Sequence, residues 1–309
     1  AAAPEPERPG EVVVPRIGDP ESREGREIAR RYGHIVGRRL PYKGRLPEPG
    51  EIESGFAASF PWAASLARYL EGQFALLRAS GNAFPRLPPL LLVGPSGCGK
   101  TTMLEWLADI CGFPAMTIPV GGTSDSAGLS AVARGWLTTQ VSAPVQLMAD
   151  HECCNPALIL DEVDKGVSDV SNRNGSVMGA LLSILQPPAD GYRDACLMAN
   201  VDISRITYLA SANALAPLTD TFRKRFIVQP VPAPGPGHFD VILPGVVRNE
   251  ARRLGVRMEM LPWLSAGDRA WLRAAFVGSG CSIRQLEQAY RLLSGERAAE
   301  EAMAMRRPN

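Results

Sequence analysis

One short segment carries the residue types that binding a nucleotide phosphate requires. The segment GPSGCGKTT, residues 94–102, follows the apolar run PLLLV and precedes MLEWLADICG, which reads as a helix. Glycines in such a loop let backbone amides approach the phosphates, a lysine neutralises the β- and γ-phosphate oxygens, and a hydroxyl can ligate Mg²⁺. We therefore predict that ATP contacts Gly94, Pro95, Ser96, Gly97, Cys98, Gly99, Lys100, Thr101 and Thr102.

A second segment, LILDEVDK, ends an apolar run with two adjacent carboxylates. It predicts a buried parallel strand whose C-terminal tip carries Asp161 and Glu162 beside the phosphate loop. There Asp161 would hold Mg²⁺ through water, together with Thr101, and Glu162 would orient and polarise the attacking water. The alternative is a strand end capped by solvated acids, which the phosphate loop upstream disfavours.

A third strand-like run, ITYLASANAL, ends in Asn213. A neutral amide at that place could hold the attacking water or sense the γ-phosphate. Alone, the run indicates only a buried strand end. A functional role for Asn213 is indicated by the order of the three segments: first the phosphate loop, then the acidic strand, then the strand that ends in an amide.

The elements that must position these residues follow an α/β pattern. Apolar strand-like runs alternate with helical patterns, which is typical of a mostly parallel sheet flanked by helices. A helix is predicted from Pro61, after which apolar residues recur at steps of three and four. We predict a flexible N-terminal arm at residues 1–54, a nucleotide-binding α/β domain at residues 55–232 and, after the linker VPAPGPG, a small helical lid domain with a tail at residues 233–309.

Composition narrows the classes of partner and the cellular location expected for the protein. Lys and Arg number 33 against 32 for Asp and Glu, so a globally basic nucleic-acid binder is disfavoured, although residues 30–45 form a basic cluster. No apolar run approaches the roughly 18 residues of a membrane-spanning helix, so no membrane partner is expected. The six cysteines are scattered, which favours reduced thiols and a cytoplasmic location. Cys98 lies near a helix start that would lower the pKa of its thiol, but we favour the alternative of a small residue that fills a variable loop position.

From about residue 60 to residue 300 the sequence resembles the ATPase part of the Lon family of AAA+ proteins. Beyond the two phosphate motifs, the resemblance lies in IPVGGTSDSAGLSAVARGW, GALLSILQP and LASANALAPLTDTFRKRF. It implies an AAA+ P-loop NTPase fold with a C-terminal lid, ATP and Mg²⁺ as cofactors, and a homo-oligomeric ring, expected to be a hexamer.

The same resemblance assigns roles to three polar residues. Asn213 would be the first sensor of the γ-phosphate, and Arg225 would be an arginine finger that reaches the nucleotide of the neighbouring subunit. Arg223 is the substitute for Arg225 within the basic run FRKR. Arg284, in GCSIRQLEQ, would be a second sensor that couples lid position to the nucleotide. A cation delivered from a neighbouring subunit neutralises transition-state charge, so hydrolysis would depend on assembly.

The resemblance also places Trp136 and Leu137 at the pore-loop position, where an aromatic and an aliphatic side chain grip an extended polypeptide. A tryptophan buried under a helix is the alternative. We expect no peptidase activity, because no Ser-Lys protease domain follows the lid. The predicted function is therefore remodelling, unfolding or threading of protein substrates, with a separate protease or adaptor as a further partner. Two alternatives stay open: a DNA-handling ring that uses the basic cluster, and a nucleotide-dependent assembly switch or scaffold.

Overall fold

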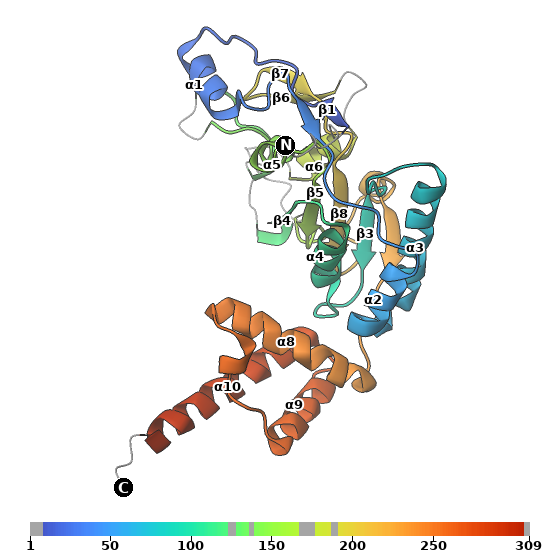
Figure 1. The fold of residues 1–309 in the computed structure, drawn as a ribbon, viewed down its shortest axis with the longest axis vertical. Coiled ribbons are helices and arrows are strands. Elements are labelled where there is room, and N and C mark those ends of the chain that lie inside the picture. The colour runs from blue at the N-terminus through green and yellow to red at the C-terminus, as the bar shows by residue number, and fades with distance from the viewer. Residues whose placement is uncertain (1–8, 123–127, 136–138, 167–176, 187–190, 306–309) are drawn as a thin grey trace, which may run out of the picture. The chain divides into compact units, whose positions relative to one another are not determined.

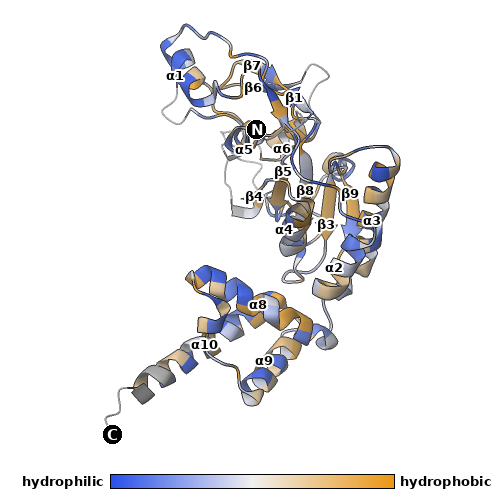
Figure 2. Ribbon diagram, in the orientation of Figure 1, coloured by the Kyte–Doolittle hydropathy of each residue, from blue (hydrophilic) through white to orange (hydrophobic). Residues whose placement is uncertain are grey.

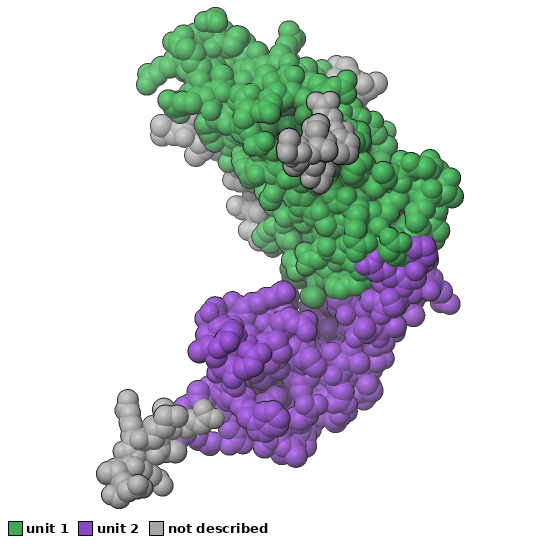
Figure 3. Space-filling model, in the orientation of Figure 1, with its two compact units in different colours: residues 1–48, 72–93, 101–229 green, residues 49–71, 94–100, 230–309 purple. Residues whose placement is uncertain are grey.

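The computed structural model describes residues 9–122, 128–135, 139–166, 177–186 and 191–305. The chain divides into two compact units, which Figure 3 colours separately. These units differ from the consecutive domains expected from the sequence, because segments far apart in the chain join each of them. Unit 1 contains residues 1–48, 72–93 and 101–229, and unit 2 contains residues 49–71, 94–100 and 230–309.

Unit 1 is built on a five-stranded sheet in the order β4-β5-β8-β3-β9 (Figure 1). The pairs β4-β5, β5-β8 and β3-β8 are parallel, which confirms the predicted α/β sheet. The apolar runs of β3 and β5, orange in Figure 2, are buried because helices cover a parallel sheet on both faces. The strands are β3 (Leu90–Val93), β4 (Ala115–Pro119), β5 (Ala157–Asp161), β8 (Thr207–Ala212) and β9 (Ile227–Pro230).

Helices connect the strands. The helix predicted from Pro61 is present as a short 3₁₀ turn, η1 (Pro61–Ala63), continued by α3, with proline at the first position where its missing N–H costs nothing. A second 3₁₀ turn, η2 (Val120–Gly122), follows β4. The α-helices between these strands are α4 (Lys100–Cys111), α5 (Ala143–His151), α6 (Val177–Leu185) and α7 (Asp220–Arg223), whereas α3 (Ala64–Ala79) begins in unit 2 and ends in unit 1.

The sequence predicts a flexible arm at residues 1–54, whereas residues 10–41 fold into unit 1. Strand β1 (Gly10–Val12) pairs antiparallel with β2 (Arg39–Pro41), and α1 (Arg23–Tyr32) lies between them in the chain. The buried apolar side chains of this segment share one hydrophobic cluster with the sheet; they are Val13, Val14, Ile28, Tyr32, Ile35 and Leu40. They are too few and too widely spaced to produce a periodic pattern, so the sequence does not reveal them.

A small antiparallel hairpin, β6 (Tyr192–Asp194) and β7 (Ala199–Val201), packs into the same cluster. Asp194 is fully buried, and all its hydrogen bonds are local to unit 1. Its Oδ1 accepts the backbone N–H groups of Cys196 and Leu197, each at 3.0 Å, and its Oδ2 accepts both the N–H and the hydroxyl of Ser142. Such charge-assisted bonds compensate the burial of a carboxylate. The hairpin turn is therefore fastened to the start of α5.

Unit 2 contains the predicted C-terminal helices. The ring centroids of Phe239 and Phe276 lie 6.1 Å apart, and Tyr290 is also buried in this unit. Ser265 and Asp268 form a capping box at the start of α9, which satisfies backbone donors that a helix end leaves open. The elements are α2 (Glu51–Ser59), η4 (Pro236–His238), α8 (Phe239–Leu254), η5 (Met258–Met260), α9 (Ala266–Gly278) and α10 (Ile283–Met305).

Candidate functional site

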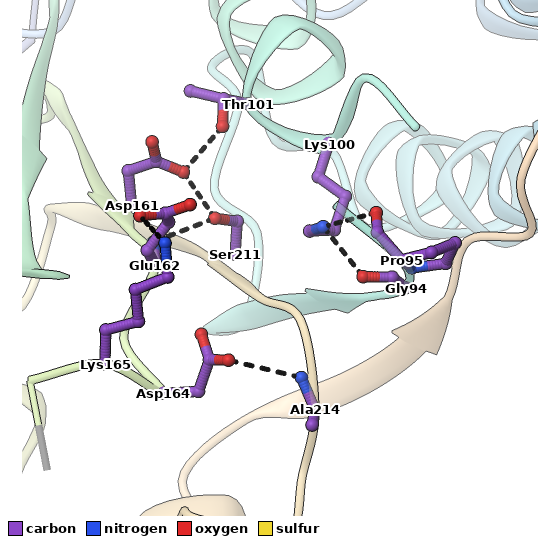
Figure 4. Close-up of polar contacts among 10 residues, drawn as sticks. All are labelled: Gly94, Pro95, Lys100, Thr101, Asp161, Glu162, Asp164, Lys165, Ser211 and Ala214. Atoms are coloured by element: carbon purple, nitrogen blue, oxygen red, sulfur yellow. Dashed lines mark hydrogen bonds and ion pairs between the residues drawn. The ribbon is translucent and has the colours of Figure 1, made fainter. Parts of the chain in front are cut away.

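The phosphate loop, residues 94–100, connects β3 to α4 and belongs to unit 2. Gly97 and Gly99 have φ angles of 78° and 91°, a region that glycine enters without steric cost. The Lys100 ammonium donates to the carbonyl oxygens of Gly94 and Pro95 at 2.8 and 3.0 Å (Figure 4). The loop therefore curls around the lysine nitrogen, the group that would neutralise a bound phosphate.

Two contacts within unit 2 hold the loop, and the sequence did not indicate either of them. A side chain at Gly94 would place its Cβ 2.0 Å from the carbonyl oxygen of Val231, so only glycine fits there. The indole N–H of Trp62 donates to the carbonyl oxygen of Cys98 at 3.1 Å. Both partners come from segments distant in sequence, which is why no local pattern could reveal them.

Cys98 does not have the reactive thiol that its place near a helix start suggested. Its side chain is buried, and this burial raises the pKa of the thiol. The thiol points toward the carbonyl oxygen of Val231, 4.0 Å away. Desolvation outweighs the nearby Lys100 charge, because an anion loses most of its hydration in such a site. Cys98 is therefore a packing residue of the loop.

Arg284, the predicted second sensor, begins α10 directly against the phosphate loop. The N–H of Ile283 donates to the carbonyl oxygen of Gly97 at 2.9 Å. A Cβ added to Gly97 would lie 3.5 Å from the Cβ of Arg284 and 2.5 Å from the hydroxyl of Ser282. The Arg284 side chain is exposed, and its Cβ lies beside the loop.

In unit 1, Asp161 accepts two hydroxyl groups on one carboxylate oxygen. Thr101 donates to its Oδ1 at 2.6 Å and Ser211 donates to the same atom at 2.5 Å (Figure 4). The Ser211 hydroxyl in turn accepts the backbone N–H of Glu162 at 3.0 Å. The predicted magnesium residues Thr101 and Asp161 are thus brought together, and Ser211 is added to them.

The oxygen atoms of Thr101 and Asp161 suit Mg²⁺. This ion prefers hard oxygen ligands, keeps several of its waters, and usually binds proteins through one or two carboxylates plus phosphate oxygens. The Thr101 hydroxyl and the Asp161 carboxylate, which lie in hydrogen-bond contact, would offer oxygen ligands to such an ion. The residues present therefore fit the implied metal.

Glu162 stands just beyond β5 with a φ of 55°. Its Oε2 accepts a hydrogen bond from the Lys165 ammonium at 2.6 Å, three residues further along the chain. A Cβ added to Gly121 would lie 3.2 Å from the same oxygen, so the glycine leaves room for this carboxylate. About a quarter of the Glu162 side chain, 24%, is exposed, which leaves the carboxylate accessible to water.

The strand order adds a residue that the sequence did not indicate. Strand β8 lies between β5 and β3. Ser211 is a residue of this intervening strand. Its hydroxyl bridges the gap, since it contacts both Asp161 and the backbone of Glu162. A serine in the run ITYLASAN carried no signal of this role.

Replacing Ser211 by alanine is expected to lower Mg²⁺ affinity or the rate of ATP hydrolysis by about 10- to 100-fold, as loss of a residue that orients a metal ligand commonly does. The variant removes one donor from Asp161 and leaves the N–H of Glu162 without its acceptor. Thr207→Val is the control on the same strand, because the buried Thr207 hydroxyl has no hydrogen-bond partner among the described residues. Steady-state ATPase assays across a Mg²⁺ titration would check this, and equal effects of both variants would contradict it.

Asn213 follows β8 directly. In the β3-β8 register Ala212 pairs with Val93, the residue that precedes the phosphate loop. The N–H of Ala214 donates to Oδ2 of Asp164 at 3.3 Å, which ties the end of β8 to the acidic segment. The backbone around Asn213 is therefore anchored at the same sheet edge as Glu162.

Arg225 and Arg223 have different surroundings. Arg223 forms an ion pair with Asp220 at 2.6 Å. Arg225 is half-buried and has no ion-pair partner among the described residues, and there the Nε atoms of both arginines lack a hydrogen bond. An arginine that binds the nucleotide of a neighbouring subunit would have no ion-pair partner within its own chain. The ion pair with Asp220 distinguishes Arg223 from Arg225, and the assignment of Arg225 as the finger stays a prediction.

Trp136 and Leu137 lie outside the described residues. The residues on either side are described: the backbones of Val132 and Gln140 form an antiparallel bridge, in which the Val132 N–H donates to the Gln140 carbonyl at 2.8 Å. Among the described residues, no helix is long and apolar enough to cross a membrane.

Comparison with known proteins agrees with this geometry. The model of the ATPase family associated with various cellular activities (AAA) matches residues 90–230. Peroxisomal Lon protease homolog 2 of Arabidopsis thaliana is 28% identical over 222 residues, 71% of this chain and 23% of that protein. The Pichia angusta protein of the same name is 35% identical over 144 residues, 46% of this chain and 15% of that protein. The chain thus spans less than a quarter of the length of these relatives.

Among solved structures, a closed-state cryo-EM reconstruction of Hsp104 with ATPγS and FITC casein superposes with a TM-score of 0.58 at 15% identity. The match covers 82% of this chain and 47% of that chain. At this identity the likeness shows the fold.

Proposed function

We propose that this chain hydrolyses ATP to remodel, unfold or thread protein substrates, because residues 90–230 match the AAA ATPase family model and the chain is similar to Lon proteases. The observation that carries the proposal is the meeting of Thr101, Asp161 and Ser211, with Glu162 next in the chain. The proposal includes no peptidase activity of these residues. A separate protease or adaptor is a proposed partner.

The residues divide the work of phosphoryl transfer. The Lys100 ammonium, curled within its loop, would bind the β- and γ-phosphate oxygens. Thr101 and Asp161 would hold Mg²⁺, which supplies neutralisation of the phosphate charge when bound. Glu162 would orient and polarise the attacking water, and Asn213 would fix the same water or the γ-phosphate. Positioning and electrostatics provide most of the catalysis in this reaction class.

Assembly would complete the site. We propose a homo-oligomeric ring, a hexamer, in which Arg225 of one subunit reaches the γ-phosphate held by its neighbour. Arg284 would report the nucleotide to the lid helices, because α10 begins against the phosphate loop. The six cysteines are free and buried, which supports a reducing compartment such as the cytoplasm.

Trp136 and Leu137 would grip the substrate. A large flat side chain can hold many sequences through apolar contact, which suits threading. Trp136→Ala is expected to abolish stimulation of ATP hydrolysis by an unfolded protein such as casein, while assembly and the basal rate are kept. Trp263→Ala is the control, because Trp263 is 87% exposed in unit 2, away from the predicted pore segment in sequence. Equal stimulation of the wild type and Trp136→Ala would reject the threading role.

The first experiment combines ATPase rate and particle size in the presence of nucleotide, with casein, single-stranded DNA and double-stranded DNA added in turn. Stimulation of an assembled ring by casein supports the proposal. Stimulation by DNA alone would replace it with the DNA-handling function. The structure gives that function little support, because several arginines of the basic cluster donate to main-chain carbonyls; they are Arg31, Arg38, Arg39 and Arg45.

A further inference from the structure

Arg134 lies two residues before Trp136 and binds main-chain carbonyls of two other segments. Its Nε donates to Cys196 at 2.9 Å, and its two terminal nitrogens donate to Asp19 at 3.2 Å and Leu197 at 3.4 Å. A guanidinium can make such contacts at once because its donors are fixed in one plane. The segment leading into Trp136 is therefore fastened to the β6-β7 turn and to the N-terminal segment.

The segment that leaves the loop is fastened to the same turn. Buried Asp194 accepts the N–H groups of Cys196 and Leu197 on one oxygen and the N–H and hydroxyl of Ser142 on the other. Ser142 lies at the start of α5, a few residues after the loop. The β6-β7 turn is thus hydrogen-bonded to Arg134, which precedes the loop. Through Asp194, the same turn is also hydrogen-bonded to Ser142, which follows the loop.

Helix α1 adds a third contact. Arg31 donates to the carbonyl oxygen of Thr139 at 3.4 Å and to the hydroxyl of Tyr32 at 3.1 Å, and that hydroxyl donates to Gln146 of α5 at 2.8 Å. A hollow of about 280 Å³ lies between the helix and the loop ends; it is lined by Arg23, Glu24, Glu27, Ile28, Arg31, Gly135 and Thr139. The N-terminal segment therefore borders both ends of the loop.

We propose that Arg134 is a positioning residue for substrate binding. Its hydrogen bonds to the β6-β7 turn and to the N-terminal segment hold the end of the Trp136 loop in place. The buried Asp194 supports this turn, because it accepts hydrogen bonds from the backbone of Cys196 and Leu197 and from Ser142. A loop that grips polypeptide has to transmit force to the body of the domain, and these contacts provide the connection. The gripping role rests on the proposed function, whereas the positioning of the loop end does not.

The test compares Arg134→Ala with Arg193→Ala. Arg193 is an exposed arginine of β6, on the same hairpin, and its side chain has no hydrogen bond or ion pair among the described residues. Hydrogen exchange at the Val132 amide, which donates to Gln140 across the loop ends, is expected to become about ten-fold faster in Arg134→Ala and to stay unchanged in Arg193→Ala. The casein concentration for half-maximal ATPase stimulation should rise about five-fold or more in Arg134→Ala, with the KM for ATP unchanged.

A substitution that merely destabilised the protein would speed exchange throughout unit 1, so exchange in β5 and β8 is measured in parallel. If Arg134→Ala fails to fold, Arg134→Lys decides: it keeps the charge but loses the planar fork, and intermediate values of both readouts are expected. If the Val132 amide exchanges as slowly in folded Arg134→Ala as in the wild type, the proposal is overturned. If casein does not stimulate even the wild type, the proposed function fails, and the exchange result still decides the role of Arg134.

Discussion

Glu162→Gln is expected to reduce ATP hydrolysis by about 100- to 10,000-fold, the range that a positioned proton acceptor contributes. The amide keeps the shape of the side chain but cannot polarise water as a carboxylate does. ATP binding should survive, because Lys100 and Thr101 do not depend on this carboxylate for their contacts. Single-turnover hydrolysis together with nucleotide-binding titrations would separate the two effects.

The matched control for this variant is Glu152→Gln. Glu152 also follows a regular element with a positive φ, 42°, but at the end of α5 rather than at the tip of β5. We expect its ATPase rate to equal that of the wild type. Loss of the ion pair between Glu162 and Lys165 should cost little stability, because the lysine is 48% exposed and such surface pairs contribute weakly. Undiminished hydrolysis in Glu162→Gln would remove this residue from the mechanism.

Arg225→Ala is expected to lower ATP hydrolysis by about 1,000-fold or more, because an arginine finger accounts for that much of the rate in related phosphoryl transfers. Arg223→Ala is the control, since its guanidinium is already paired with Asp220. A change of a few-fold at most is expected there. Rates measured over a range of protein concentrations would show whether the remaining activity depends on assembly.

Mixing two inactive variants tests whether the finger acts between subunits. Arg225→Ala keeps an intact nucleotide site, and Glu162→Gln keeps an intact finger. In mixed rings, Glu162→Gln subunits would supply fingers to Arg225→Ala sites, so part of the activity should return. Normal hydrolysis by Arg225→Ala alone at every protein concentration would refute the finger assignment.

The sequence by itself determined the nucleotide chemistry. The phosphate loop, the acidic pair and the α/β alternation are encoded in contiguous residues, because phosphate binding needs several adjacent backbone amides and a strand end needs only a local apolar run. Thr101 and Asp161, distant in the chain, could be paired because motif order and the parallel sheet bring strand ends to one edge. The strand between β5 and β3 was not determined in this way.

The tertiary structure decided which other groups support that chemistry. Ser211 joins Asp161 only because β8 lies between the two motif strands, and Trp62 holds the phosphate loop only because residues 49–71 pack with the C-terminal helices. The N-terminal residues looked like a flexible arm because their buried side chains are sparse and meet partners more than 100 residues away, such as Tyr32 and Gln146. Contacts of this kind depend on how distant segments fold together. The local spacing of residue types therefore does not predict them.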